Sequence, residues 1–166
     1  MKVQDVMSRE LRTCAPDDDL GKAAIEMWQG DCGILPVVWA DRVVGMITDR
    51  DICMGLALKG CRPGERRVRD VMSREVYSCI PDDDLGDALE TMASRRVRRL
   101  PVVDGDAIVG MVSMNDVLVH AEERGHPPTR QILATLRAIC TPSALRVPST
   151  IAVSPAAKRT SMPPAA

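Results

Sequence analysis

The chain has 166 residues, of which 45% are apolar and 27% are charged, so its composition is that of a soluble globular protein rather than a collagenous, fibrous or wholly disordered one. Lysine and arginine total 22 and the acidic residues 23, and a formal charge of −1 gives no overall reason to expect nucleic acid or a polyanion as partner. The longest apolar stretch, residues 33–39, is far shorter than the roughly 20 residues that cross a bilayer. The first residues lack the apolar region of a signal peptide, so we expect a cytoplasmic protein with no membrane contact.

An internal duplication organises the chain. The sequence VQDVMSRE at residues 3–10 recurs 65 residues later as VRDVMSRE at 68–75. Without a gap, CAPDDDLG at 14–21 then matches CIPDDDLG at 79–86, and LPVV at 35–38 matches LPVV at 100–103. About half of the aligned positions are identical, so the chain consists of two related units.

Each unit begins with a short strand and a helix. Residues 10–14 and 75–79 are expected to form strands that end before Pro16 and Pro81, because proline has no amide hydrogen for a sheet ladder. After the triple aspartate, apolar residues recur at helical spacing, which predicts a helix with one buried face. The aspartates are interpreted as helix caps and not as a catalytic cluster.

A hairpin and a second helix complete each unit. Residues 36–39 and 42–47 are β-branched runs around a tight turn, and 101–103 with 107–112 repeat them. A second helix is expected from near Thr48 to Lys59, and from Ser113 to Glu122. The order is therefore β-α-β-β-α, an α/β (α+β) class, and the two units must pack together because so small a sheet cannot bury both of its faces alone.

The expected domain boundaries follow from this repeat. They are 1–60 and 68–122 for the two units and 61–67 for a linker rich in glycine and proline. Residues 123–140 are expected to add an amphipathic helix at 129–140, and residues 141–166, rich in Pro, Ala, Ser and Thr, are expected to be a disordered tail.

The six cysteines and two histidines show no CxxC motif and no Cys/His pair at metal spacing, so no metal site is expected. Most of the cysteines are interpreted as small apolar fillers. Cys14 and Cys79 occupy matching positions, and one interpretation brings them together near the axis that relates the units, with a disulfide less expected than free thiols. Trp28 and Trp39 have no aromatic counterparts in the second unit, which indicates either a lopsided core or a partner surface.

The pattern with chemical content is glycine, two apolar residues, a hydroxyl, two variable residues and a carboxylate. It occurs as GMITDRD at 45–51 and as GMVSMND at 110–116. The hydroxyl and the carboxylate lie three residues apart in the first turn of a helix, so they project to one side. A carboxylate can accept hydrogen bonds from the two hydroxyls of a ribose, and the free amides at a helix start favour phosphate. The alternative is a helix capping box, which the same residues approximate.

As a set, these motifs resemble a tandem pair of cystathionine β-synthase (CBS) domains over about residues 1–122. The resemblance implies a Bateman module, in which two β-α-β-β-α units pack about a pseudo-twofold axis and leave two clefts. Such clefts bind AMP, ADP, ATP, NAD or S-adenosylmethionine as regulators, and no other cofactor is expected. It also implies a stand-alone regulatory protein that forms a homodimer and acts in trans on an unknown protein partner.

Residue by residue, the resemblance assigns Thr48 with Asp51, and Ser113 with Asp116, to the ribose of two separate ligands. The residues that it places in the adenine slots are Ala15, Ile34, Met46, Ile80 and Met111. Because the clefts in this family are composite, it further implies that Ala15 and Ile34 face the Asp116 cleft and that Ile80 faces the Asp51 cleft.

The two clefts are not expected to be equal. RRVRR at 95–99 stands where the first unit has GDCGI at 30–34, and Arg98 and Arg99 directly precede the LPVV motif. They are candidates for phosphate binding in the Asp116 cleft, and Arg50 is the candidate in the other. The alternative for the arginine run is a solvated helix end, and a nucleic-acid patch is disfavoured because aromatic residues are scarce.

Three functions follow from these patterns: a regulatory module that binds adenosyl ligands, an enzyme that acts on a nucleotide, and a dimerising scaffold without a ligand. No nucleophile and base set is suggested by the sequence, which argues against the enzyme. Both carboxylates and both hydroxyls are present, which argues against a scaffold that has lost its ligands.

Overall fold

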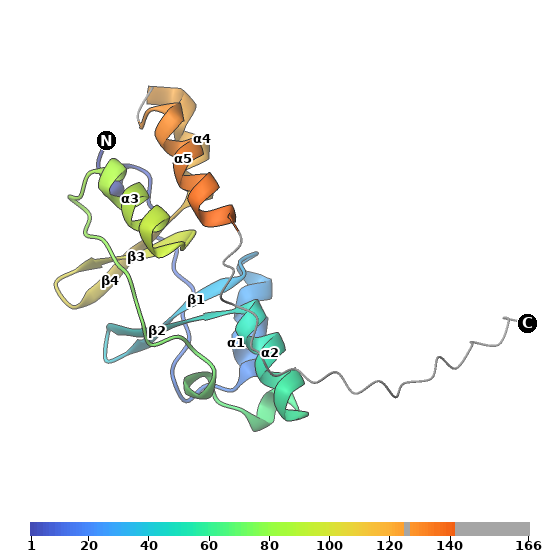
Figure 1. Ribbon diagram of the computed structural model, residues 1–166. Helices are drawn as coiled ribbons and strands as arrows, with labels where there is room; N and C mark the ends of the chain where they lie inside the picture. The colour runs from blue at the N-terminus through green and yellow to red at the C-terminus, as the bar shows by residue number, and fades with distance from the viewer. Residues whose placement is uncertain (125–126, 142–166) are drawn as a thin grey trace, which may run out of the picture.

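The computed structural model describes residues 1–124 and 127–141, and Figure 1 shows it as two groups of helices, each beside its own pair of strands. The expected disordered tail therefore falls almost wholly outside the described residues. The first repeat contains the elements α1 Leu20–Gln29, β1 Ile34–Trp39, β2 Arg42–Thr48 and α2 Asp49–Lys59. The second contains α3 Leu85–Arg95, β3 Arg99–Asp104, β4 Ala107–Ser113 and α4 Met114–Arg124, followed by α5 Thr129–Cys140. Short 3-10 turns occupy Val3–Asp5, Pro63–Glu65 and Val68–Asp70.

The predicted α/β repeats are confirmed, with antiparallel hairpins β1–β2 and β3–β4 in matching register. The predicted first strand of each repeat is reduced to a single parallel bridge, Cys14 to Val37 in one and Cys79 to Val102 in the other. The Cys14 amide donates to the Pro36 carbonyl at 3.1 Å, and the Val38 amide donates to the Cys14 carbonyl at 2.8 Å. Pairing goes no further because Pro16 follows, and proline has no amide hydrogen to donate to the ladder.

The aspartates before each first helix act as caps, as predicted. Asp19 accepts from the Lys22 amide at 2.9 Å, and Asp84 accepts from the Gly86 amide at 2.8 Å. These bonds satisfy amides that have no partner inside the helix, and the negative charge lies at the positive end of the helix dipole. The triple aspartates are therefore part of the structural frame.

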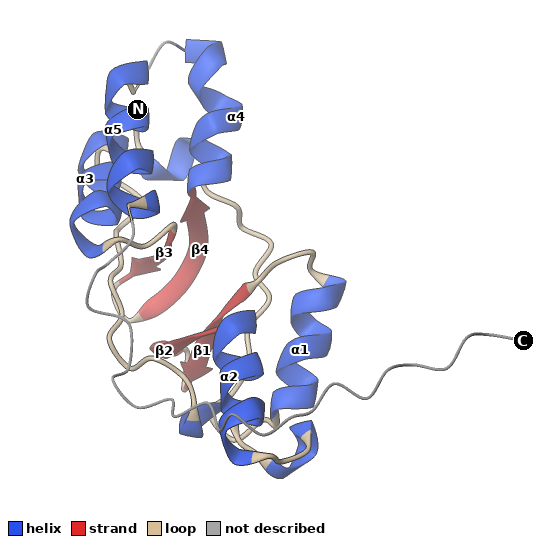
Figure 2. Cartoon of the chain, turned by 45° about the vertical axis from the view of Figure 1, so that its right-hand side comes forward, coloured by secondary structure: helices blue, strands red, loops and turns tan. Residues whose placement is uncertain are grey.

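The two repeats exchange their leading segments. Ser8 forms a bridge with Met111, and its counterpart Ser73 forms the same bridge with Met46, the counterpart of Met111. Two bridges related in this reciprocal way are what a pseudo-twofold axis between the repeats generates. β2 and β4 contact each other between the two groups of helices, as can be followed in Figure 2.

This exchange divides the interior into two cores that do not follow the sequence repeats. Val3, Val6 and Met7 pack into the core of the second repeat, and Val68 packs into the core of the first. The polypeptide before each repeat thus completes the hydrophobic core of the other one. Burial of these apolar side chains stabilises the association of the repeats as well as each fold.

The glycine that opens each hydroxyl–carboxylate motif permits the close approach of the exchanged segment. A Cβ atom on Gly45 would lie 2.8 Å from the Met72 sulfur and 2.8 Å from the Ser73 carbonyl oxygen. A Cβ atom on Gly110 would meet Met7 and the Ser8 carbonyl in the same way. Glycine at these positions therefore allows the backbones to bridge.

The predicted C-terminal helix is present as α5 and packs on α3 (Figures 1 and 2). Ile132 is buried in the second core, and the buried Thr135 hydroxyl donates to the Leu89 carbonyl at 3.4 Å. The Arg96 guanidinium donates to the carbonyls of Ala138 and Thr141 at the end of α5. The helix is thus fixed along its length and at its C-terminal end.

No helix of the described ranges is long and apolar enough to span a membrane.

Cys14 and Cys79 stay free thiols, as favoured, and they do not pack against each other. Both are free thiols, and Cys14 lies in the first core whereas Cys79 lies in the second. Burial raises the pKa of each thiol to about 12. Each side chain therefore fills its core as a neutral group and is a poor nucleophile.

The β1–β2 turn is strained, which leads to a stability prediction. Ala40 has φ of 49°, in the left-handed region that favours glycine, and the matching residue of the other hairpin is Gly105, with φ of 59°. Ala40→Gly is expected to raise the free energy of unfolding by about 1 kcal/mol, or roughly 2–4 °C in melting temperature. Differential scanning calorimetry measures it, with Gly105→Ala as the reverse control. A lower melting temperature for Ala40→Gly would contradict the prediction.

Candidate functional site

The first hydroxyl–carboxylate pair lies where β2 meets α2. Thr48 is the N-cap of α2, and its hydroxyl donates to Asp51 Oδ2 at 2.7 Å. The same oxygen accepts from the Thr48 amide at 3.0 Å, and the Asp51 amide donates to Thr48 Oγ1 at 3.1 Å. These reciprocal bonds make a capping box with aspartate in place of glutamate.

The second pair repeats this geometry between β4 and α4. The Ser113 hydroxyl donates to Asp116 Oδ2 at 2.6 Å, and the Ser113 amide donates to the same oxygen at 2.7 Å. The Asp116 amide returns a bond to Ser113 Oγ at 3.3 Å. The two sites thus share one arrangement although their other residues differ.

The capping box leaves acceptor capacity for a ligand. In both pairs only Oδ2 receives a hydrogen bond from the described part of the chain, and all four residues are half-buried. The hydroxyl hydrogen already points to the carboxylate, so the hydroxyl can only accept from a ligand. Oδ1 of each aspartate keeps the lone pairs that a ribose diol would use. The structural role and the ligand role are therefore compatible.

The segment before each hairpin lies beside the pair of its own repeat. Ile34 is paired with Thr48 across the β1–β2 ladder, and Arg99 is paired with Ser113 across the β3–β4 ladder. The Met114 amide donates to the Arg98 carbonyl at 3.0 Å. The backbone of Arg98 and Arg99 thus lies beside the Ser113–Asp116 motif, and the assignment of their side chains to phosphate stays a prediction. Ile34 lies next to Thr48 of its own repeat, whereas the resemblance implied that it faces the Asp116 cleft of the other repeat. The cleft that Ile34 faces therefore stays a prediction.

The proposed adenine-slot methionines lie at the junction of the repeats. The Met46 amide and carbonyl each bond to Ser73 at 2.9 Å, and Met111 bonds to Ser8 in the same way. Both methionine side chains are partly exposed. Each slot residue on β2 or β4 is therefore bordered by a segment of the other repeat.

Ala15 and Ile80 begin the turn that follows each bridging cysteine, Cys14 or Cys79. The Ala15 amide donates to Asp18 Oδ2 at 2.8 Å, and the Ile80 amide donates to Asp83 Oδ2 at 2.9 Å. Burial alone would raise the pKa of Asp18, but the hydrogen bonds from Lys22 and Ala15 lower it below its ordinary value. The middle aspartate of each triplet therefore fixes the turn that carries the slot residue.

The arginine run divides into engaged and available side chains. The Arg95 guanidinium lies over the Tyr77 ring, 4.8 Å from its centre, and Arg96 holds the end of α5. Among the side chains that the structure describes, which exclude those of residues 59 and 121–126, Arg50, Arg98 and Arg99 find no hydrogen-bond or ion-pair partner. These are the three cations assigned to phosphate, so their charges are available to a ligand.

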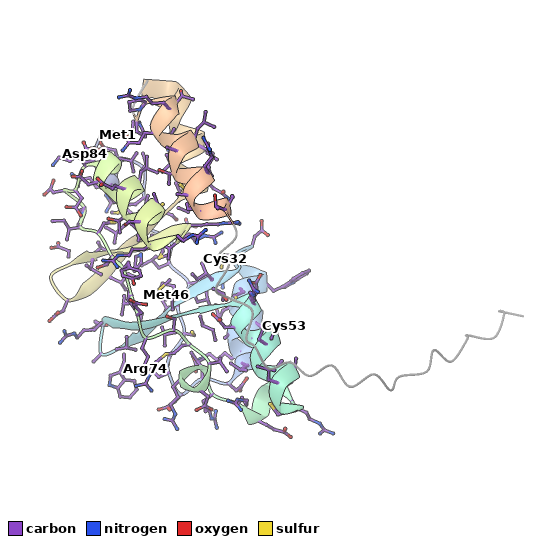
Figure 3. The ribbon with its side chains drawn as sticks, in the orientation of Figure 1. Met1, Cys32, Met46, Cys53, Arg74 and Asp84 are labelled. Carbon is purple, nitrogen blue, oxygen red and sulfur yellow. The ribbon has the colours of Figure 1, made fainter. Side chains whose placement is uncertain are left out.

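Two cations near the junction were missed in the sequence. Arg74 follows Ser73, which bridges to Met46, and Arg9 follows Ser8, which bridges to Met111. Both are exposed, and Figure 3 labels Arg74 and Met46. The available signal was the repeated MSRE sequence, which places an arginine at the same position of both units.

The CBS domain family model matches the chain twice, over residues 3–57 and 68–123. The chain belongs to the CBS domain family. The CBS domain-containing protein YhcV of Bacillus subtilis is 39% identical over 118 residues, which cover 71% of this chain and 84% of that protein. Inosine-5′-monophosphate dehydrogenase of Methanocaldococcus jannaschii is 34% identical over 119 residues, but the match covers only 23% of that enzyme. This second likeness concerns a part of the enzyme.

Solved CBS structures share the fold. The structure of the CBS domain pair of protein MJ0100 in complex with 5′-methylthioadenosine and S-adenosylmethionine has a TM-score of 0.65 and 25% identity, covering 72% of this chain and 98% of that one. Hypoxic Response Protein I with two coordinated zinc ions has a TM-score of 0.66 and 28% identity, covering 72% of this chain and 98% of that one. In the described portion of this CBS protein, no three His, Cys, Asp or Glu side chains group as metal ligands would.

Proposed function

We propose that this CBS pair is a regulatory module that binds an adenosyl ligand at each hydroxyl–carboxylate pair. The carrying observation is that Asp51 and Asp116 have the same surroundings, with Oδ2 held by the backbone and the hydroxyl, and Oδ1 left for the ligand. The similar MJ0100 pair was solved with two adenosyl compounds, which supports this ligand class. The ribose hydroxyls donate to the free carboxylate oxygen.

The remaining candidate residues supply the rest of the ligand contacts. Met46 and Met111, with Ile34, Ala15 and Ile80, provide apolar surface for adenine. Arg98 and Arg99 provide charge for phosphates at the Asp116 site, and Arg50 does so at the Asp51 site. The candidate ligands are AMP, ADP, ATP, NAD and S-adenosylmethionine. No step in this function requires a bond to be broken, so we propose binding and not catalysis.

The exchanged segments give ligand binding a way to act on a partner. Met46 on β2 bonds to Ser73, in the segment that packs into the first core and then continues into the second repeat. Met111 on β4 bonds in the same way to Ser8, in the segment that packs into the second core and continues into the first repeat. A ligand that contacts both elements stabilises one relative orientation of the repeats, in proportion to its differential affinity for that orientation. The altered surface would then regulate a protein in trans.

A homodimer is the assembly that we propose for this module. The exposed faces of α2 and α4 carry apolar side chains at matching positions, with Met54 40% exposed and its counterpart Val119 69% exposed. Leu118 on α4 and Leu58 on α2 add to these faces. Apolar patches of this kind mark association surfaces.

A dimerising scaffold without a ligand is the second candidate, because the capping boxes alone account for both carboxylates.

A ligand panel separates the two candidates. Ligand-free protein, refolded from denaturant, is heated with AMP, ADP, ATP, NAD or S-adenosylmethionine. At about 100-fold excess over the dissociation constant, a ligand of the native state adds about 2.7 kcal/mol, or roughly 5–10 °C in melting temperature. Guanosine analogues of each nucleotide are the control. A folded protein that shows no shift with any adenosyl compound at millimolar concentration leaves only the scaffold.

A further inference from the structure

A groove of about 450 Å³ lies between α1 and α2, on the helical side of the first repeat. It contains none of the residues assigned to the adenosyl ligand. Met27 and Ile52 are its buried apolar residues, and Trp28 stands at its edge with 88% of its surface exposed. The remaining lining residues are Ala24, Asp31, Cys32, Gly33, Asp49 and Cys53. Trp28, for which the sequence left open a lopsided core or a partner surface, therefore lies on the surface and not in the core.

The duplication supplies an internal comparison for this groove. The second-repeat counterparts of Ala24 and Asp49 are Leu89 and Met114, and both are buried. Leu89 and Met114 belong to the core cluster in which Ile132 of α5 is buried. The second repeat thus fills the equivalent space with larger side chains and covers it with the C-terminal helix. The first repeat leaves it open.

The charges of the two faces are opposite. Arg96 donates to the carbonyls at the end of α5, whereas the first repeat has Asp31 at the same position. Asp49 adds a second carboxylate to the groove, where its counterpart is apolar. The first groove is therefore complementary to an apolar segment that carries positive charge.

The chain itself contains such a segment directly after α5. Residues 142–166 include Arg146, Lys158 and Arg159 and no acidic residue, and their apolar side chains include Leu145 and Ile151. We propose that residues 144–159 dock in the groove between α1 and α2, with the apolar side chains against Met27 and Ile52 and the cations facing Asp31 and Asp49. An extended chain covers about 3.3 Å per residue, so Leu145 can lie up to about 13 Å and Ile151 up to about 33 Å from Thr141 at the end of α5.

Alkylation of cysteines in the full-length chain tests this docking. Cys53 lines the groove and Cys140 lies on α5 outside it, and both are exposed. With the segment docked about four-fifths of the time, iodoacetamide modifies Cys53 about fivefold more slowly than in the undocked chain. The paired substitution Leu145→Asp and Ile151→Asp should remove this protection and leave the Cys140 rate unchanged. Peptide mass spectrometry measures both rates.

The control variants separate docking from its alternatives. Asp31→Arg should release Cys53 as the paired substitution does, because it reverses the charge that faces the segment. Cys14 is buried, so its lack of modification verifies that each variant is folded. Equal Cys53 rates in the parent and the paired variant would overturn the proposal. Protection that grows with protein concentration and survives the paired substitution would overturn it too, because a second copy would then cover the groove.

Discussion

Asp51→Asn is expected to remove one of two binding equivalents for the adenosyl ligand, and Asp116→Asn the other. Asparagine keeps the size of the side chain and one oxygen for the capping bonds from Thr48 or Ser113. It replaces the free carboxylate oxygen with an amide group that cannot accept from the ribose hydroxyls. Loss of charge-assisted hydrogen bonds lowers affinity at the altered site about 10- to 100-fold. Isothermal titration calorimetry gives the stoichiometry and both affinities.

Matched capping variants test whether the effect is specific to binding. Asp19 and Asp84 are the N-caps of α1 and α3, and neither belongs to the hydroxyl–carboxylate motif. Asp19→Asn and Asp84→Asn should therefore leave both binding equivalents intact, with stability changes of about 1 kcal/mol or less. If Asp51→Asn and Asp116→Asn also leave stoichiometry and affinity unchanged, the motif is a capping box only and the proposed ribose contact is wrong.

The elements that follow from local rules were predictable from the sequence. The triple aspartates, the strand-ending prolines and the β-branched hairpins each depend on neighbours within a few residues. Because the two repeats share their sequence pattern, each element expected in one repeat was also expected at the equivalent position of the other, which gave a second check on it. This is why the helices, the hairpins and the capping role of Asp19 and Asp84 agree with the structure.

The exchange of leading segments was not predictable in this way. Val3 and Val68 occupy equivalent positions in sequence, and nothing local shows that each packs into the core of the other repeat. The exchange depends on the close approach at Gly45 and Gly110, which involves partners distant in the chain. The same reason explains why Arg9 and Arg74 were missed, since only the bridges to Met111 and Met46 place them near the candidate sites.

The sequence predicted that the arginine run lies near the GMVSMND motif, but it could not predict which arginines contact other residues and which stay free. Arg95 and Arg96 are neighbours with the same charge, yet one lies over Tyr77 and the other caps α5. The role of Arg96 depends on a helix that begins more than 30 residues later, at Thr129, and the role of Arg95 depends on Tyr77, which lies on the preceding segment. Side-chain partners of this kind are set by tertiary packing and not by local pattern.

The second large effect is expected from Arg99→Ala at the Asp116 site. In the Asp51→Asn background, where only this site is expected to bind, Arg99→Ala should weaken ATP about 5- to 20-fold and S-adenosylmethionine less than twofold. The reason is that a phosphate loses a charge-assisted contact, whereas a sulfonium ligand without phosphate loses none. The partial exposure of Arg99 keeps this effect below that of a fully buried pair. Isothermal titration at low and at physiological salt measures it, and the difference for ATP should shrink as salt rises.

Arg95→Ala is the matched control, because it removes the same charge from the same run. Its guanidinium is engaged over Tyr77, so the ATP affinity should change less than twofold. The reciprocal variant Ile34→Arg places an arginine beside Thr48, where the first repeat lacks the counterpart of Arg99. It should increase the preference of the Asp51 site for ATP over S-adenosylmethionine, measured in the Asp116→Asn background. Equal losses of ATP affinity for Arg95→Ala and Arg99→Ala would show that the run acts through net charge alone, and the assignment of Arg99 to phosphate would then fall.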